Sequence, residues 1–363
     1  MPTLSNRTST FTDSVIRRMT RISNQYGAVN LSQGFPDFEP REALAAKITH
    51  FSGVSVDPNS ELVVTCGSTE AMMAAMMSVT NPGDKVIVFS PFYENYGADT
   101  ILSGAEPIYV PLIPPEFNFD ADVLEDAFRQ KVKAIIVCNP SNPCGKVFTR
   151  KELEIIAQLA KKYDAFVITD EVYEHIVYAP HKHVYISTLP GMWERTISCS
   201  SLSKTYSITG WRLGYVIASE RIIDRVKKVH DFLTVGAAAP LMEAATVGLC
   251  FPDSYYEELQ AHYTHMKQLF CDGLSQFGLS FTDPQGAYYV LLDVSKYGVK
   301  DDLHFCEWLA EHVGVGAVPG SCFFREDVNH LIRFHFAKRD ETLLAALDRL
   351  SEMDSKALKD YRK

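Results

Sequence analysis

Residues 165–173 read Ala-Phe-Val-Ile-Thr-Asp-Glu-Val-Tyr, an apolar and β-branched run that ends in two carboxylates. Apolar and polar residues do not alternate in this run, and such continuous hydrophobicity predicts a strand buried on both faces. Strands of this kind are typical of parallel sheets covered by helices. Further runs of the same character lie on either side of it, at Leu62–Thr65, Lys85–Phe89, Ala134–Cys138, Thr196–Ser200 and Gly214–Ala218. The pattern predicts an α/β domain.

Helical patterns lie between these runs. Thr149 and Glu152 have the spacing of a capping box, which satisfies two of the free N–H groups at a helix start. Apolar residues follow at helical spacing, at Leu153, Ile156, Ala157 and Ala160. A second helix, rich in Ala and Met, is predicted over Glu70–Val79. These helices are expected to cover the sheet.

The length of 363 residues favours two domains, because single hydrophobic cores stop growing near 250–300 residues. We expect a large α/β domain over 41–246 and a small α+β domain made of 1–40, as an N-terminal arm, plus 247–363. In the second part, helices are predicted near Tyr255–Phe277, Leu303–His312 and Glu341–Met353. A strand pair is predicted at Ala287–Asp293 and Leu331–Phe336.

The composition favours small-molecule chemistry. The net charge of −10 argues against a nucleic-acid or membrane partner, since either would need a concentrated basic face. The eight cysteines form no CxxC pair, which makes a disulfide framework improbable and assigns no metal ligands. No apolar run reaches 18 residues, and the first 18 residues are polar. We therefore expect a cytoplasmic protein.

Unusual polar residues follow most of the predicted strands, at the sheet edge where α/β proteins bind ligands. Gly67, Ser68 and Thr69 open a helix and could bind a phosphate through free N–H groups, although alone they fit an ordinary helix cap better. Tyr93 alone fits a core aromatic, and Asn142, between two prolines, a turn residue. Asp170 ends a buried strand, where a carboxylate needs a cationic or hydrogen-bonding partner. Alternatively, it caps the next helix.

A lysine completes the set. Lys204 follows the strand at Thr196–Ser200 and precedes a Gly-Trp turn, where solvent is scarce, whereas a lone lysine is usually a solvated surface group. A pyridoxal 5′-phosphate (PLP) site requires these four features together: a phosphate-binding turn, an aromatic ring that stacks on the cofactor, an acid at a strand end and a lysine.

The constellation resembles the class I aminotransferases of PLP fold type I, and within them the kynurenine, methionine and glutamine transaminases. The motifs occur in the family's order over nearly the whole chain, at Asn30–Asp37, Pro91–Tyr93, Asn139–Pro143, Asp170–Tyr173, Ser201–Thr205, Gly210–Arg212 and Ile332–Phe334. The resemblance implies a mainly parallel seven-stranded sheet in the large domain, and a homodimer. It also implies transfer of an amino group from an L-amino acid to a 2-oxo acid.

The same resemblance implies a role for each site residue. Lys204 would be the Schiff-base lysine and move the α-proton, as a free amine with a depressed pKa. Asp170 would pair with the pyridine nitrogen, Tyr93 would stack on the ring, and Asn142 and Tyr173 would bind its phenolic oxygen. The phosphate would be held by Gly67, Ser68, Thr69, Ser201 and Arg212, and the substrate carboxylate by Arg333 with Asn142 and the Gly34 backbone.

Rival functions remain open on this reasoning. A PLP-dependent cysteine-conjugate β-lyase would use the same residues. An aspartate aminotransferase is a less favoured alternative. A DNA-binding regulator of the same fold would need a basic helix-turn-helix, which the sequence lacks. Residues 230–240 contain no arginine to pair with a second substrate carboxylate. Phe232, Leu233 and Val235 there suggest an apolar pocket wall or packing at the domain junction. Donors with neutral or aromatic side chains are therefore expected.

One stretch departs from the family pattern. The family has a helix and a loop with an aromatic residue between the Gly-Phe-Pro-Asp motif and the phosphate cradle. Here Glu39-Pro40 runs into Arg41 and, after a short stretch, reaches Gly67. A few dozen residues are absent, either because the chain lacks them or because the sequence omits them.

Overall fold

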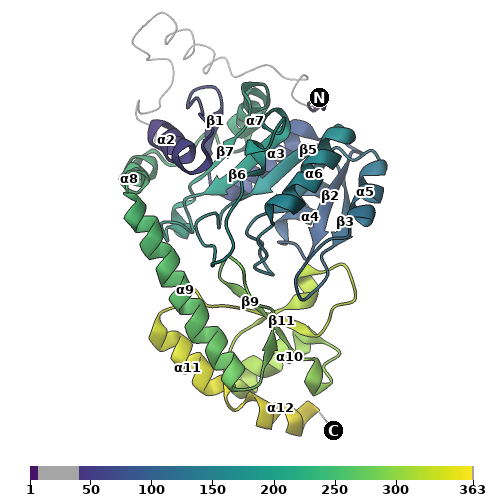
Figure 1. Ribbon diagram of the computed structural model, residues 1–363, viewed down its shortest axis with the longest axis vertical. Coiled ribbons are helices and arrows are strands. Elements are labelled where there is room, and N and C mark those ends of the chain that lie inside the picture. The colour runs from purple at the N-terminus through teal and green to yellow at the C-terminus, as the bar shows by residue number, and fades with distance from the viewer. Residues whose placement is uncertain (7–40, 362–363) are drawn as a thin grey trace, which may run out of the picture.

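The computed structural model describes residues 1–6 and 41–361. Gly34 and the Asn30–Asp37 motif lie outside the described residues. Figure 1 shows a large sheet flanked by helices and a smaller sheet below it, with the long helix α9 running from one to the other. Their order along the chain follows the prediction of an α/β part and a smaller α+β part, while the domain boundaries at 40–41 and 246–247 stay predictions.

The larger sheet has seven strands in the order β1-β7-β6-β5-β4-β2-β3. All neighbours pair in parallel except β7, which is antiparallel to both β1 and β6. The prediction of a mainly parallel seven-stranded sheet is confirmed. The strands are β1 (Leu62–Thr65), β2 (Lys85–Ser90), β3 (Glu106–Pro111), β4 (Ala134–Cys138), β5 (Phe166–Asp170), β6 (Thr196–Ser201) and β7 (Gly214–Ile217).

Strand β3 is the one strand of this sheet that the hydrophobic runs did not reveal. It contains Pro107 and Pro111 and begins with the exposed Glu106. A proline cannot donate to a sheet ladder, so it is tolerated at an edge strand, and β3 lies at the edge beyond β2. An edge position therefore explains a strand without a continuous apolar run.

Helices cover both faces of this sheet (Figure 1). One face packs on α5 and α6 and the other on α3, α4 and α7. The predicted capping box is present, since Glu152 N–H donates to Thr149 Oγ1 (3.3 Å) and Thr149 N–H to Glu152 Oε2 (2.8 Å). The helices are α2 (Arg41–Ser52), α3 (Ser68–Val79), α4 (Asn95–Leu102), α5 (Ala121–Arg129), α6 (Arg150–Lys162), α7 (Glu220–Leu233) and α8 (Ala239–Leu249).

The smaller sheet has the order β10-β11-β9-β8 and is antiparallel throughout. Its strands are β8 (Ser280–Phe281), β9 (Tyr289–Asp293), β10 (Val318–Pro319) and β11 (Leu331–His335). Its helices are α9 (Asp253–Gln276), α10 (Asp302–Trp308), α11 (Asp340–Leu350) and α12 (Met353–Tyr361). The predicted strand pair is therefore confirmed as β9 and β11. The helix expected over Leu303–His312 ends its α-helical part at Trp308 and continues as a π turn over Leu309–Val313.

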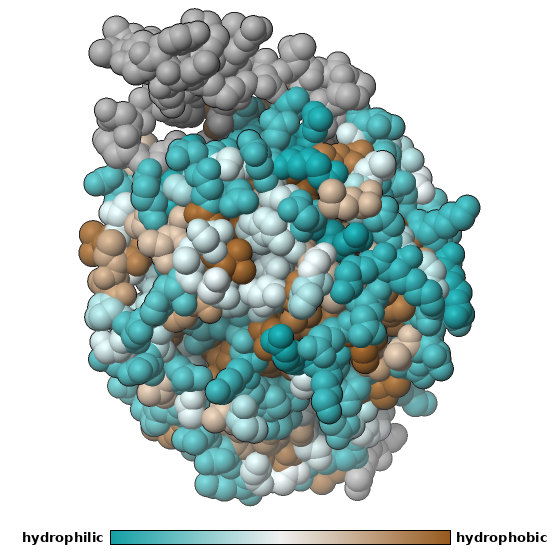
Figure 2. Space-filling view, turned by 45° about the horizontal axis from the view of Figure 1, so that its top comes forward, coloured by the Kyte–Doolittle hydropathy of each residue, from teal (hydrophilic) through white to brown (hydrophobic). Residues whose placement is uncertain are grey.

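The molecular surface is mostly polar, and the cysteines form no disulfides. Figure 2 shows a mostly hydrophilic face with hydrophobic atoms in scattered groups. All eight cysteines lie in the described part and are free thiols. Within residues 1–6 and 41–361, no helix combines the length and the apolar character that a membrane span requires.

Candidate active site

Three strand ends bring the phosphate-binding candidates together. Ser201 ends β6 and pairs with Gly214, the first residue of β7. Gly214 lies against the turn at the start of α3, where a Cβ on it would come within 2.6 Å of the Ser68 nitrogen. The antiparallel return of β7 therefore places Ser201 close to the N-terminus of α3.

Gly67 is the N-cap of α3 and has a φ of 82°, a conformation that side chains rarely adopt. A Cβ at this position would overlap the guanidinium of Arg212, so the Arg212 side chain lies directly over the Gly67 backbone. Arg212 has a left-handed conformation with a φ of 54° and donates from Nη1 to Thr209 O (3.1 Å). The helix N-terminus and the guanidinium together form an anion site, with the half-buried Ser68 and the exposed Thr69 in the first turn of the helix.

Lys204 lies in the turn after β6 and is half-buried. Burial and the charge of Arg212 lower the pKa of its ammonium, while the charge of Asp170 opposes them. Its Nζ lies 5.9 Å from the ring centre of Tyr288. A lysine with a lowered pKa is more readily available as a free amine near neutral pH, which is what a nucleophile or general base requires.

Asp170 ends β5 and is buried. Its Oδ2 accepts from the Tyr96 hydroxyl (2.8 Å) and its Oδ1 from the Val172 N–H (3.4 Å). Burial raises the pKa of this carboxyl, while Tyr96, Val172 and the charge of Lys204 act to lower it. Nearby on α4, burial and the charge of Asp170 raise the pKa of Asp99 to about 7. Burial therefore raises the pKa of both of these neighbouring carboxyl groups.

Tyr173 and Tyr93 lie near this carboxylate. Tyr173 is buried, and its hydroxyl shares a hydrogen bond of 2.9 Å with the Tyr289 hydroxyl. Tyr93 is half-buried, and burial together with the charges of Asp170 and Tyr289 raises the pKa of its phenol. Both predicted ring-binding tyrosines thus interact with Tyr289 of the small sheet.

Arg333 extends from β11 of the small sheet and reaches the large one. Its Nη1 donates to Asn142 Oδ1 (2.7 Å). Its guanidinium lies 4.5 Å from the ring centres of both Tyr289 and Phe323. A planar guanidinium held between two rings is a rigid fork suited to a carboxylate. The structure therefore brings together the two predicted substrate residues that it describes.

Sequence reasoning assigned no role to four aromatic side chains of this site, Tyr96, Tyr288, Tyr289 and Phe323. Tyr96 belongs to the Pro91–Tyr96 stretch that follows β2, so its position at a strand end was a usable signal. The other three come from the small domain, and their proximity to Lys204 and Arg333 depends on how the two sheets pack. No local pattern indicates that.

For residues 230–240 the sequence left open an apolar pocket wall or packing at the domain junction. Phe232, Leu233 and Val235 are 65%, 43% and 53% exposed, so they do not pack at a domain junction. His230, in contrast, is buried. The apolar side chains lie at the end of α7 and in the turn after it, where the helix leaves the sheet.

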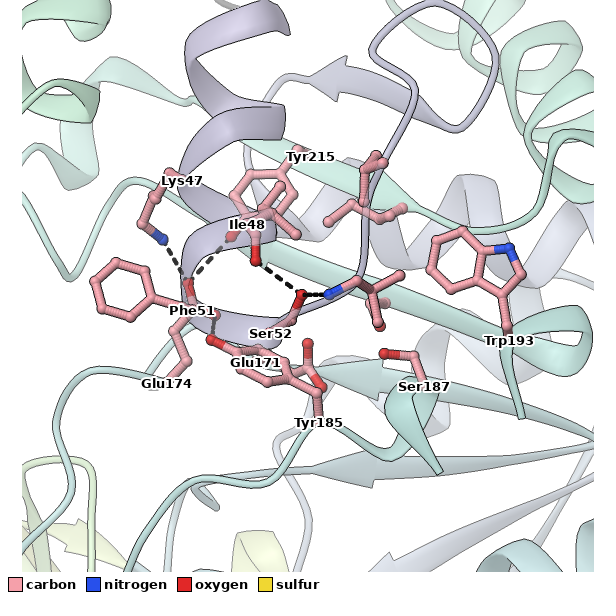
Figure 3. Close-up of a pocket in the computed structure, with 14 residues that line it drawn as sticks. Lys47, Ile48, Phe51, Ser52, Glu171, Glu174, Tyr185, Ser187, Trp193 and Tyr215 are labelled. Carbon is pink, nitrogen blue, oxygen red and sulfur yellow. Dashed lines mark hydrogen bonds and ion pairs between the residues drawn. The ribbon is translucent and has the colours of Figure 1, made fainter. Parts of the chain in front are cut away.

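A buried polar cluster lies around Glu174, in the turn that follows β5 (Figure 3). Glu174 accepts from Lys47 of α2 (2.8 Å), from the Tyr185 hydroxyl (2.7 Å) and from the Tyr215 hydroxyl (3.1 Å). The cavity beside them has a volume of about 20 Å³, room for one water molecule rather than a cofactor. This cluster fastens α2 to the turn and is not itself a ligand site.

The described residues fit PLP. The glycine turn, where a Cβ would overlap Arg212, leaves backbone N–H groups open to a phosphate. Asp170 is a buried carboxyl whose hydrogen-bond donors are both neutral, and a protonated ring nitrogen would supply the cation that it lacks. Lys204 lies between these two ends of the site, as its interactions with both Arg212 and Asp170 indicate.

This sheet topology with these residues defines an enzyme of PLP fold type I. Residues 5–350 match the family model "Aminotransferase class I and II". The chain belongs to this family of PLP-dependent aminotransferases.

Curated relatives extend over nearly the whole chain. A probable N-succinyldiaminopimelate aminotransferase of Mycobacterium tuberculosis is 34% identical over 95% of this chain and 97% of its own length. The methionine aminotransferase of Escherichia coli is 33% identical over 93% and 95%. Kynurenine–oxoglutarate transaminase 3 of Mus musculus is 33% identical over 90% and 85%.

Solved structures agree with this assignment. The N-succinyldiaminopimelate aminotransferase of M. tuberculosis has a TM-score of 0.83 at 35% identity, covering 96% of this chain and 99% of that one. The E. coli methionine aminotransferase also has a TM-score of 0.83, at 33% identity, covering 93% and 97%. The sequence alignment with the M. tuberculosis relative spans 386 positions, more than the 363 residues of this chain. That relative therefore has residues without a counterpart here, in agreement with the shortened stretch noted in the sequence.

Proposed function

We propose that this aminotransferase takes the amino group from L-amino acids with neutral or aromatic side chains and passes it to a 2-oxo acid. The observation that carries the proposal is the position of Arg333 between the rings of Tyr289 and Phe323. A carboxylate bound to this guanidinium has aromatic surface on both sides, and such surface favours an apolar or aromatic side chain. Relatives named for methionine and for kynurenine support the same class.

The reaction needs a base at the substrate α-carbon, and Lys204 is the residue that fits. When bound, PLP withdraws electrons from that carbon and so makes its proton removable. Lys204 Nζ takes the proton, and its lowered pKa favours the free amine that can do so. Arg333 and Asn142 hold the α-carboxylate, which fixes the direction of the Cα–H bond.

The remaining residues act on the cofactor. Asp170 would pair with the ring nitrogen: burial raises the pKa of its carboxyl, and the hydrogen bonds from Tyr96 and Val172 and the charge of Lys204 act in the opposite direction. Tyr93 stacks on the ring, and Tyr173 and Asn142 bind its phenolic oxygen. Gly67, Ser68, Thr69, Ser201 and Arg212 hold the phosphate. The Gly34 backbone, outside the described residues, assists with the carboxylate.

We also propose a cytoplasmic homodimer with each active site near the subunit boundary. Large apolar side chains are exposed along 232–251, among them Phe232, Leu233, Val247 and Phe251. Exposed apolar groups of this size are characteristic of surfaces that associate. They extend from the last turn of α7 through α8 to the residues just after it.

A panel of amino acids tests the substrate class. Each L-amino acid is scored by kcat/KM with 2-oxoglutarate as acceptor, and methionine, glutamine, kynurenine and aromatic donors should lead. A preference for aspartate by more than about tenfold, or roughly 1.4 kcal/mol of transition-state binding, would contradict the proposal. Pyruvate and ammonia formed from a cysteine conjugate without an acceptor would instead favour the β-lyase.

A further inference from the structure

The carboxylate of Glu70 is a buried junction in the first turn of α3. Its Oε1 accepts from His230 Nδ1 (2.6 Å) and from the Thr234 hydroxyl (2.7 Å), and its Oε2 from the Cys66 N–H (2.5 Å). The side chains of Glu70 and His230 are 7% and 3% exposed. Burial by itself raises the pKa of Glu70, but these three donors and the charge of His230 lower it overall. Glu70 is therefore an ionised carboxylate whose hydrogen bonds join the start of α3 to the end of α7 and to Cys66.

Two of those donors come from the C-terminal end of α7. His230 lies in the last turn of this helix, and Thr234 is its C-cap, with its N–H bonded to His230 O (3.1 Å). Two residues further on, Gly236 O accepts from Cys66 Sγ (3.5 Å). Helices α3 and α7 pack side by side, so the end of α7 is held against the start of α3 by two separate links.

The third donor leads to the phosphate turn. Cys66 directly precedes Gly67. Its N–H donates to Glu70, the third residue of α3. Because Gly67 is a glycine with a positive φ and its backbone is free to adopt many conformations, its geometry depends on what fixes the residues on either side. Glu70 fixes one side, and Gly214, which abuts Gly67 and Ser68, fixes the other.

An ordinary helix cap would need none of this. A capping glutamate bonds the N-cap N–H of its own helix and is usually solvated. Glu70 instead takes donors from two parts of the chain separated by 160 residues or more. We propose that Glu70, His230 and Thr234 are positioning residues for the cofactor phosphate, through which the end of α7 sets the shape of the Gly67 turn. This inference rests on the proposed role of that turn in binding the phosphate.

The experiment compares two cofactors that differ only in the phosphate. Apoenzyme is titrated with PLP and with pyridoxal, and binding is followed by the visible absorption of the bound form. Thr234→Val and His230→Leu should each weaken PLP binding about tenfold, because a hydrogen bond to a charged group is lost, and leave pyridoxal binding unchanged. His230→Asn keeps a donor near the position of Nδ1 and should restore most of the PLP affinity.

Two control variants separate the possible failures. Thr264→Val makes the same chemical change on α9, where the hydroxyl donates to Gln260 O of the same helix, and should alter neither affinity. Arg212→Leu should weaken PLP but not pyridoxal. If Arg212→Leu behaves so while Thr234→Val leaves PLP binding intact, the positioning role is wrong. If Arg212→Leu leaves PLP binding intact, the phosphate site itself is wrong. Equal weakening of both cofactors by Thr234→Val, or by His230→Leu, would mean a general loss of structure and would also overturn the inference.

Discussion

Tyr96 donates a hydrogen bond of 2.8 Å from its hydroxyl to Oδ2 of Asp170, and both residues are buried. The tyrosine comes from α4 and the aspartate from the end of β5, 74 positions further along the chain. A neutral donor stabilises the carboxylate without cancelling its charge. The whole charge of Asp170 is therefore available to a cationic ring nitrogen.

Replacing Tyr96 by Phe should shift the acidic limb of the kcat profile to higher pH. Burial already raises the pKa of Asp170, and loss of the Tyr96 bond raises it further, so the carboxyl takes up its proton at a higher pH. Near neutral pH, kcat should fall about tenfold, since a hydrogen bond to a charged group contributes roughly 1.5–3 kcal/mol. Tyr163→Phe, at the end of α6, is the matched control. An unmoved acidic limb would disprove this role of Tyr96.

Replacing Lys204 by Ala should abolish transamination and the visible absorption of lysine-bound cofactor. No other described residue is assigned to the proton at the substrate α-carbon, and removal of a general base costs at least about 10²-fold. Turnover is measured alongside the spectrum, with the exposed Lys151→Ala as control. Turnover at the wild-type rate would remove Lys204 from the mechanism.

Replacing Lys47 by Met should lower the free energy of unfolding by about 3–5 kcal/mol, because it leaves the buried carboxylate of Glu174 without its cation. Urea unfolding at neutral pH measures this. The double variant Lys47→Met with Glu174→Gln should recover part of the loss, since no buried charge is then left unpaired. A double variant less stable than Lys47→Met would contradict this account.

The same pair predicts how wild-type stability depends on pH. Although burial opposes it, Lys47 together with His175 lowers the pKa of Glu174 well below its ordinary value of 4.5. A lowered folded-state pKa gives stability that is fully present above 4.5 and is lost as the pH falls toward the folded value. Unfolding free energies should therefore decline below about pH 4.5, and the decline should be shallower in Lys47→Met.

The molar mass measured by light scattering should be that of a dimer. Phe232→Glu should shift it toward that of the monomer. The phenylalanine is 65% exposed in the single chain, and burying a carboxylate in its place would be costly. Glu243→Gln, a change on α8 that adds no charge, is the control. A wild-type monomer with full activity would refute the dimer.

Local patterns in the sequence are sufficient for much of the fold. The β5 run ending in Asp170 and the Thr149 capping box each depend on residues close together in the chain, and both are present. The edge strand β3 escaped because its prolines break the apolar run that reveals the central strands. The domain boundaries and the residue roles stay predictions.

The active site could be predicted only as far as its residues follow strand ends. Lys204, Asp170 and Asn142 do so, and Arg333 was identified by its motif. Tyr288 and Tyr289 lie near them only because the small sheet docks below the large one. Lys47, the cation beside Glu174, and His230, a donor to Glu70, lie 127 and 160 residues from these glutamates along the chain, and no short-range pattern in the sequence encodes such pairs.

Helix α9 connects the two halves of the molecule. Its 24 residues span about 36 Å. Near one end the Tyr255 hydroxyl is bonded to Thr205 O (2.7 Å), the carbonyl next to Lys204 in the chain. Near the other, Gly273 lies flush against Leu347 of α11. The part of the chain that carries Arg333 is therefore connected to the main chain beside Lys204 by a single helix, in addition to the hydrogen bond between Arg333 and Asn142.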